Sequence, residues 1–250
     1  MTSEDSEQRN RPQPGAEFDA FASDYSGGMD NSVKALLGES GDDFLTVKLN
    51  WLTRRFWRGD DKVGPATILD YGCGRGDLIR VMGQSGIKAR FVGSDVSGGM
   101  MQQGLKNWPR DLPRPTFLQQ TGAAVPHDSA SFDLVVISSV LHHVPVAERP
   151  DVYAEIQRLL KPGGQVVVFE HNPLNPVTRY VVSHTPIDEH AILLNAREVK
   201  RGLAAAGFNL VDAGYLMFAP PRLRRIGAWF DVLLGWLPLG AQYAVRAVKS

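Results

Sequence analysis

The sequence predicts an α/β protein built around an open, mostly parallel sheet with helices on both faces. Short apolar segments typical of buried strands recur at residues 67–70, 90–95, 116–119, 132–138 and 165–170. Helical patterns between them begin near Asp77, Ser97 and Arg149, with a shorter piece at residues 139–143. Because parallel strands need a crossover of about helix length, this alternation predicts right-handed strand–helix–strand connections.

The amino-terminal residues predict a tail and a cap in front of this sheet. Residues 1–15 are polar and turn-forming, a composition that favours disorder. Residues 16–62 carry apolar side chains at helical spacing, among them Phe18 and Tyr25, so we expect a helical cap. The main domain is then expected to span residues 63–250.

The carboxyl-terminal part predicts two further strands, which makes seven in all. A helix at residues 196–206 ends before Gly207, in the place that glycine favours after a helix. Strand patterns follow at residues 209–218 and 242–248, and the link between them is broken by prolines. Since no clear crossover helix lies there, we expect an antiparallel final pair. Residues 172–195 are expected to form an insertion beside the ligand site.

The composition limits the class of protein. The 250 residues, 43% of them hydrophobic, can bury one substantial core. The 27 basic and 27 acidic side chains balance, so no overall field attracts nucleic acid or an anionic bilayer. Cys73 is the single cysteine, which excludes an internal disulfide and fits a reducing, cytoplasmic setting. The amino terminus lacks the apolar core of a secretory signal, and the apolar residues 226–240 are fewer than the ~20 that span a bilayer.

A glycine-rich loop follows the first strand. Gly72, Gly74 and Gly76 alternate directly after Asp70, so a ligand could approach bare backbone there, although a tight turn alone is the other interpretation. The dinucleotide fingerprint requires a third glycine where this chain has Asp77. Asp70 would also repel a pyrophosphate, so a cationic ligand fits better. S-adenosylmethionine carries an ammonium and a sulfonium group and no phosphate.

The second strand ends in Asp95, a little over 20 residues beyond the first loop glycine. A carboxylate at this position can accept hydrogen bonds from both hydroxyls of a ribose. The alternative is that Asp95 caps the helix that follows. Met100 and Met101 would flank an adenine ring or fill the core.

Four segments in order resemble the successive motifs of the class I S-adenosylmethionine-dependent methyltransferases, of the small-molecule type. These are "ILDYGCGRGDL", "GSDVSGGMM", "FDLVVISSVLHHV" and "LLKPGGQVVVFEHN", and the resemblance is strong over residues 66–170. It implies a Rossmann-like seven-stranded sheet with an antiparallel last strand. It also implies S-adenosylmethionine as the cofactor.

The resemblance assigns roles to individual residues. Asp70 and its loop would hold the amino-acid end of the cofactor, and Asp95 would hold the ribose. Ser138, at the end of the fourth strand, would lie near the methionine part. The remaining implied contacts are Gly72, Cys73, Gly74 and Gly76 in the loop, and Val96, Met100, Thr121 and Gly122 around adenine. Thr121 stands where the family often has an acidic residue.

Histidines follow two strands at the edge that should face the methyl acceptor. His142 and His143 follow the fourth strand, and Glu170 and His171 end the fifth. Methyl transfer is an in-line displacement, so side chains are needed mainly to align the partners and to remove a proton. We expect a histidine of the pair to act as base with help from Glu170 or His171, although one of the pair could only pack. We expect no metal site, because adjacent histidines on a short turn should point in different directions and no HExxH motif occurs.

The acceptor side is expected to be roofed by the cap and by the insertion. Tyr25 would lie over the methyl end of the cofactor or pack against the cap. The segment at residues 220–240 mixes arginines with tryptophans and leucines. It could contact a membrane surface, but we favour packing on the domain or at a dimer interface.

The sequence therefore predicts an enzyme that methylates a small molecule, and we expect transfer to oxygen of a secondary metabolite, sugar or lipid-like compound. The alternative is an inactive S-adenosylmethionine-binding module that acts through a protein partner. An NAD enzyme is disfavoured by the missing fingerprint glycine. Nucleic acid is disfavoured as a substrate because "SSVLHHV" replaces an NPPY-like motif. The oligomeric state stays open.

Overall fold

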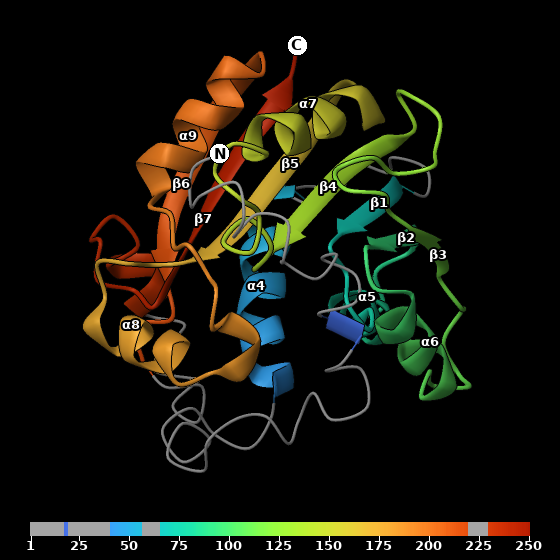
Figure 1. The fold of residues 1–250 in the computed structure, drawn as a ribbon, viewed down its shortest axis with the longest axis horizontal. Helices are drawn as coiled ribbons and strands as arrows, with labels where there is room; N and C mark the ends of the chain where they lie inside the picture. The colour runs from blue at the N-terminus through green and yellow to red at the C-terminus, as the bar shows by residue number, and fades with distance from the viewer. Residues whose placement is uncertain (1–17, 20–40, 57–65, 220–229) are drawn as a thin grey trace, which may run out of the picture.

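The computed structural model describes residues 18–19, 41–56, 66–219 and 230–250. Its centre is a seven-stranded sheet in the order β3-β2-β1-β4-β5-β7-β6 (Figure 1). The strands are β1 (Ala66–Tyr71), β2 (Ala89–Asp95), β3 (Thr116–Gln119), β4 (Phe132–Ser138), β5 (Leu160–His171), β6 (Phe208–Leu216) and β7 (Gln242–Lys249). The first five pair in parallel, whereas β7 is antiparallel to both β5 and β6. The predicted fold, including its antiparallel end, is confirmed.

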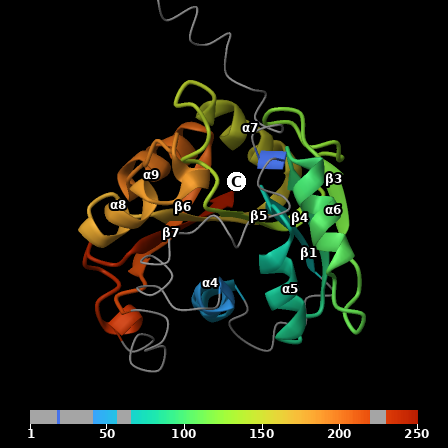
Figure 2. The same ribbon diagram turned by 60° about the horizontal axis from the view of Figure 1, so that its bottom comes forward.

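Helices cover both faces of this sheet. They are α4 (Gly41–Phe56), α5 (Asp77–Gln84), α6 (Gly98–Lys106), α7 (Arg149–Leu159), α8 (Pro176–Ser183) and α9 (Ala196–Ala205), with a short 3-10 helix η1 (Pro186–Asp188). In Figure 2, α4 and α5 lie below the sheet and α7 and α9 lie above it. The helices predicted near residues 77, 97, 149 and 196 therefore occur.

The side chains of β4 explain why the sheet needs helices on both faces. Leu134 and Val136 pack with α4 and α5, whereas Val135 and Ile137 pack with α7 and α9. All four are fully buried. A strand buried on both faces is apolar throughout its length, as the segment "LVVI" is.

The described part of the predicted cap belongs to this core. Trp51 and Leu52 of α4 are buried against Phe169 of β5, and the Trp51 and Phe169 rings meet edge to face with centroids 5.5 Å apart. The predicted tail at residues 1–15 lies outside the described residues, as does most of residues 16–62 apart from the ranges given above. The sheet itself begins at Ala66.

Two local expectations differ from the structure. Strand β5 begins at Leu160, five residues before the predicted start, because Leu160 pairs with Phe132 of β4 across an irregularity that precedes the regular pairing from Gln165. The segment predicted as a short helix at residues 139–143 is instead a series of turns, and Ser139 has a φ of 60°.

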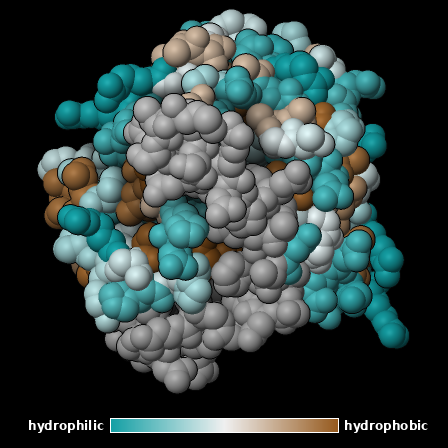
Figure 3. All heavy atoms as spheres, viewed as in Figure 1, coloured by the Kyte–Doolittle hydropathy of each residue, from teal (hydrophilic) through white to brown (hydrophobic). Residues whose placement is uncertain are grey.

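Apolar side chains remain exposed in two places. Leu174, Val177 and Tyr180 are exposed on and just before α8, and Figure 3 shows apolar atoms at that edge and in a recess beside it. In the segment before β7, Leu233 and Trp236 are 64% and 75% exposed, so these two side chains do not pack on the domain, and packing at a dimer interface stays a prediction. Residues 220–229 of that segment lie outside the described residues. Among the helices that the structure describes, none combines the length and the apolar character of a membrane span.

Candidate active site

The site lies where the strand order reverses. Strand β1 pairs with β2 on one side and with β4 on the other, and ligands of open α/β sheets bind beyond the carboxyl ends at such a point. A cavity of about 810 Å³ opens there. It is lined by residues from α4, from the ends of β1, β2, β4 and β5, and from α8 and η1.

The glycine loop forms one wall of the cavity and is shaped by its backbone. Gly72, Gly74 and Gly76 have φ values of 71°, 53° and 78°, a region that side-chain-bearing residues rarely adopt. The Gly72 and Cys73 amides both donate to the Ser94 carbonyl oxygen of β2, at 2.7 and 2.9 Å. A Cβ atom on Gly72 would overlap the Val140 side chain. The loop is therefore held tightly between β2 and the end of β4, with Gly74 beside the cavity.

Asp95 joins this loop to the next helix. Its Oδ2 accepts the Gly74 amide at 2.7 Å and its Oδ1 accepts the Ser97 amide at 2.9 Å. The N-cap of α6 is Ser97, whose hydroxyl accepts the Met100 amide, so Asp95 is not the cap. Its carboxylate is buried at the cavity wall, where it can also accept hydrogen bonds from a bound ribose.

The buried acidic groups of this end fit a cationic ligand. Asp70 is 2% exposed, and burial together with the nearby Asp95 charge raises its pKa to about 7. Burial also raises the pKa of Asp95. A ligand ammonium beside Asp70 would restore its charged form. This is the charge that the amino-acid end of S-adenosylmethionine carries, so these residues fit the cofactor.

Of the four residues expected around adenine, three line the cavity and one does not. Val96, Met100 and Gly122 line the cavity. Thr121 is exposed, is paired in an isolated bridge with Ala124, and is not among the lining residues. The lining side chain is Gln120, one residue earlier, which is buried and whose backbone amide donates to the Asp95 carbonyl oxygen.

Glu170 organises the opposite end of the cavity. Its Oε1 accepts the amides of Val140 and Leu141, at 2.9 and 2.7 Å, and thereby fixes the turn after β4. Its Oε2 lies 2.6 Å from Nδ1 of His142. Both side chains of this pair are almost fully buried. The predicted partnership of a histidine with the strand-five carboxylate is thus present in the geometry.

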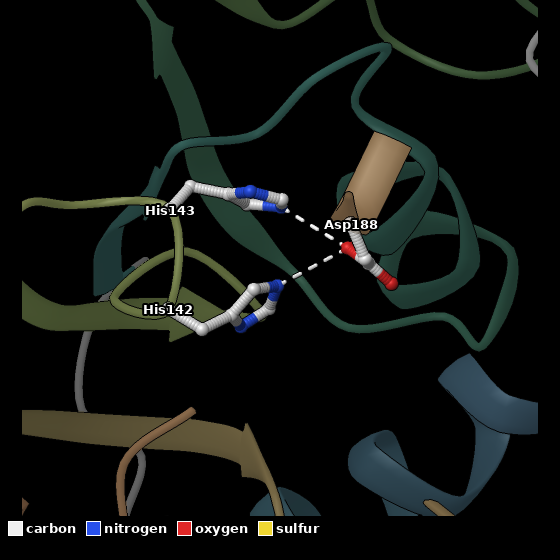
Figure 4. A group of neighbouring side chains, drawn as sticks. All are labelled: His142, His143 and Asp188. Atoms are coloured by element: carbon white, nitrogen blue, oxygen red, sulfur yellow. Dashed lines mark ion pairs between the residues drawn. The ribbon is translucent and has the colours of Figure 1, made fainter. Parts of the chain in front are cut away.

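Asp188 completes a cluster that the sequence did not predict. Helix η1 carries its carboxylate to the histidine pair, where Oδ1 lies 3.4 Å from Nε2 of His142 and 3.3 Å from Nε2 of His143 (Figure 4). The two rings have centroids 4.2 Å apart. The reason for expecting no metal site, that the histidines point in different directions, is therefore wrong. Nothing in the spacing around Asp188 marked it as part of the site.

The cluster carries fixed charges at neutral pH. Burial lowers the pKa of His142, but the Glu170 and Asp188 carboxylates outweigh it and raise this pKa to about 9. Burial raises the pKa of Glu170, but the His142 charge and hydrogen bond outweigh it and lower this pKa to about 2. Burial, followed by the His142 charge, lowers the pKa of His171 to about 4. At pH 7 His142 is therefore an imidazolium paired with a carboxylate, and His171 is neutral.

Lys48 links the two ends of the cavity. This lysine of α4 is buried, and its Nζ donates to the hydroxyls of Ser138 and Ser139 at 2.8 and 3.3 Å. Burial lowers its pKa to about 8, against the Glu170 and Asp70 charges that raise it. Sequence reasoning treated this helix as a cap and did not assign Lys48. The one available signal was a lysine among the apolar positions of the helix.

The remaining predicted residues fall in different places. Ser138 and His171 line the cavity, as does Cys73. Tyr25 lies outside the described residues, so its role over the methyl end stays a prediction. Phe18 is described, and its ring meets the His143 ring edge to face at 5.1 Å between centroids.

Comparison with known proteins identifies the domain. Residues 68–164 match the family model described as "Methyltransferase domain". This match covers less than half of the chain and agrees with the predicted resemblance to the class I S-adenosylmethionine-dependent methyltransferases. S-adenosylmethionine stays the cofactor that the resemblance implies, and a solved structure that shares the fold holds bound S-adenosylhomocysteine.

Curated relatives of this methyltransferase domain include quinone-modifying enzymes. The chain is 30% identical over 163 residues to a demethylmenaquinone methyltransferase of Lactococcus lactis, covering 64% of this chain and 59% of that one. It is 33% identical over 147 residues to a ubiquinone/menaquinone biosynthesis C-methyltransferase of Hahella chejuensis, covering 54% and 56%. The chain thus matches less than two thirds of the length of these relatives.

Solved methyltransferase structures share the fold at low sequence identity. The possible histamine N-methyltransferase of Thermotoga maritima has a TM-score of 0.66 at 16% identity, over 95% of this chain and all of that one. The magnesium protoporphyrin IX methyltransferase of Synechocystis, solved with bound S-adenosylhomocysteine, has a TM-score of 0.64 at 18% identity, over 96% and 100%. At such identities the likeness establishes the fold.

Proposed function

We propose that the protein transfers the methyl group of S-adenosylmethionine to a ring carbon of a small hydroxylated aromatic acceptor of the quinol type. One observation carries this proposal. A single cavity holds the cofactor-binding loop, with Asp70 and Asp95, and also the cluster of His142, His143 and Asp188. Cofactor and acceptor would therefore meet inside one cavity.

The walls at the acceptor end suit a flat apolar ring. Side chains from α4, α8 and η1 line it, namely Phe44, Leu45, Val177, Val181 and Ile187. The polar groups converge at one point, the histidine cluster, where a ring hydroxyl would bind. The names of the quinone-modifying relatives support the same class of acceptor.

The chemistry divides between the cofactor and this chain. Bound S-adenosylmethionine supplies a methyl group on a sulfonium, whose sulfur keeps the C–S electron pair and leaves as neutral S-adenosylhomocysteine. We assign to His143 the role of the base that removes the proton of the acceptor hydroxyl, because His142 already carries a proton at neutral pH. The deprotonated oxygen delocalises its negative charge onto ring carbons, and one of these carbons forms the new bond to the methyl group. The proton on that carbon then leaves to water and the oxygen regains the proton held by His143, which restores the aromatic ring, its hydroxyl and the base, with one proton released overall.

Transfer to oxygen is the competing outcome for the same bound acceptor. The sequence favoured it, since a deprotonated hydroxyl is itself a nucleophile. Carbon is preferred here because the Hahella relative is a C-methyltransferase. The choice depends on which acceptor atom faces the methyl group.

The test is methyl transfer by the purified protein with carbon-13-methyl S-adenosylmethionine and a panel of dihydroxynaphthalenes and phenols. The proposal predicts formation of S-adenosylhomocysteine and a product whose labelled methyl resonance is that of a methyl on aromatic carbon. A resonance of an O-methyl ether would replace the proposal by the oxygen alternative. No product with any member of the panel would remove the proposed acceptor class.

Exposed His184 provides the matched control for the cluster. His184→Ala should leave turnover unchanged, whereas His143→Ala should lower it about 100-fold, within the usual contribution of a general acid or base. Equal turnover in both variants would remove the assignment to His143.

A further inference from the structure

We propose that His142, His143 and Asp188 form a binding site for a divalent transition-metal cation of the Zn²⁺ type. The ligand atoms would be the two imidazole Nε2 atoms and Oδ1 of the aspartate, and the ion would displace the Nε2 proton that His142 carries in its absence. The role of this cation in methyl transfer rests on the proposed function, but its binding does not.

The spacing of the three atoms matches a coordination sphere. Zn²⁺ binds imidazole nitrogen and carboxylate oxygen at about 2.0–2.1 Å, which places neighbouring ligand atoms of a tetrahedron about 3.3 Å apart. The two nitrogen-to-oxygen separations are 3.4 Å for His142 and 3.3 Å for His143. Both are longer than the common N–H···O distance of about 2.9 Å. All three atoms lie within 4.8 Å of one another, so small side-chain rotations would close the third edge.

The second nitrogen of His142 is held as metal-binding histidines usually are. Its Nδ1 lies 2.6 Å from Oε2 of Glu170, a carboxylate that is itself fixed by two backbone amides. A carboxylate in this position sets the ring orientation and makes the opposite nitrogen a better ligand. Glu170 therefore orients His142 so that its Nε2 faces Asp188.

The surroundings leave a coordination position open. Both histidines and Asp188 line the acceptor end of the cavity, and Figure 4 shows the two rings directed at the same carboxylate oxygen from the turn after β4. Three protein ligands with an open fourth position are typical of catalytic rather than structural zinc. Two imidazoles and one carboxylate suit Zn²⁺ and its late first-row neighbours better than Mg²⁺ or Ca²⁺, which prefer oxygen.

The open position would take the hydroxyl oxygen of the acceptor. A bound cation would polarise that oxygen and stabilise its anion. It would thereby lower the pKa of the hydroxyl, so that His143 would not be needed as the base. The proton then leaves to water in the cavity. The proposal thus deepens the function given above by naming an oxygen-ligating acceptor.

Metal binding is tested on the full chain without any acceptor. The protein is stripped with a chelator and titrated with Zn²⁺ in a calorimeter, and separately with Co²⁺, whose visible bands report coordination geometry. We expect one ion per chain, with Co²⁺ bands of tetrahedral or five-coordinate intensity. Absence of binding up to millimolar Zn²⁺, with the protein folded, would overturn the proposal.

Variants locate the ion. Asp188→Asn and His143→Ala should each weaken Zn²⁺ binding at least 100-fold, and Glu170→Gln should weaken it about 10- to 100-fold through His142. The exposed His184→Ala should bind like the unchanged protein. Circular dichroism checks that each variant folds. If Asp188→Asn does not fold, His143→Ala provides the test. Binding that survives both ligand variants would place the ion elsewhere and overturn the proposal.

Methyl transfer separates this proposal from the proposed function. If the metal-free protein methylated the acceptor and did not bind Zn²⁺, the proposed metal site would be ruled out and the methyltransferase function would stand. Binding at the cluster with no turnover on any acceptor would support the metal site and remove the proposed acceptor class.

Discussion

The two ends of the cavity are built by different means. The cofactor end comes from two short segments, at residues 70–77 and 95–100, and its shape depends on backbone amides and positive φ values. The acceptor end draws single side chains from α4, β5, η1 and the turn after β4, and it is held by charge, as in the Glu170–His142 pair. Substitutions at the cofactor end should therefore change affinity for the cofactor, whereas substitutions at the acceptor end should change stability and turnover.

The largest expected effect is on stability, at the acceptor end. Glu170→Ala leaves the His142 imidazolium and two turn amides without their buried partner, and should lower the free energy of unfolding by about 3 to 5 kcal/mol. Urea denaturation measures it. The control at the other end is Asp77→Asn, which breaks partly exposed pairs with Arg75 and Arg80 and should cost about 1 kcal/mol or less. Equal losses would contradict the proposed difference between the ends.

The next effect is on cofactor binding. Asp95→Ala removes the acceptor of the Gly74 amide and the predicted acceptor of the ribose hydroxyls. Loss of about two charge-assisted hydrogen bonds corresponds to roughly 100-fold weaker binding. Calorimetry with S-adenosylhomocysteine measures it. Asp188→Ala, at the acceptor end, should change this affinity less than about threefold, and a comparable loss in both variants would break the distinction.

The charge of the histidine pair should appear in the pH dependence of stability. The His142 pKa is raised from 6.5 to about 9, so its contribution is complete below pH 6.5 and is lost as the pH rises through 9. Between pH 6.5 and 8 the free energy of unfolding should fall by roughly 1 to 2 kcal/mol more in the unchanged protein than in His142→Asn. Both proteins should also carry His171→Asn, because the His142 charge lowers the pKa of His171 and its removal would change that second titration. If the free energy of unfolding changed equally with pH in both proteins, the Glu170–His142 pair would not raise the pKa of His142.

The smallest effect concerns Lys48, which lies between the two ends. Lys48→Met removes the positive charge that holds down the pKa of Asp70, so that pKa should rise further above about 7. Cofactor binding at pH 7 should then weaken about fivefold and recover at higher pH, because the ligand ammonium needs the ionised carboxylate. Lys48→Arg keeps the charge and is the control. Cofactor affinity is measured from pH 6 to 8.5 in the three proteins. If both variants showed the same affinities as the unchanged protein over this range, the prediction would be contradicted.

The cofactor end was predictable from the sequence because its determinants are local. Gly72, Gly74 and Gly76 lie in one loop, and Asp95 ends the adjacent strand, so periodicity and motif spacing sufficed to place them. Thr121 does not line the cavity, whereas Gln120 does, and Thr121 is paired in a bridge with Ala124 directly after β3. The strands of the sheet were predictable for the same reason, with errors only at their ends.

The acceptor end was predictable only in part. His142 and Glu170 follow strands that the apolar pattern identifies, and neighbouring strand ends meet at one edge of the sheet. Asp188 comes from an irregular connection, and Lys48 comes from a helix whose apolar pattern indicated only a cap. Both are placed by tertiary packing, which no spacing in the sequence encodes. The charge state of His142 likewise depends on carboxylates from distant segments.

The division of work between the two ends is tested most directly by single-turnover methyl transfer at increasing S-adenosylmethionine concentration. Asp95→Ala should regain most of the unchanged rate at saturating cofactor, because its defect is in affinity. His143→Ala should remain about 100-fold slow at any cofactor concentration, because its defect is in the chemical step. A slow Asp95→Ala at saturation, or a His143→Ala that recovers, would contradict the account.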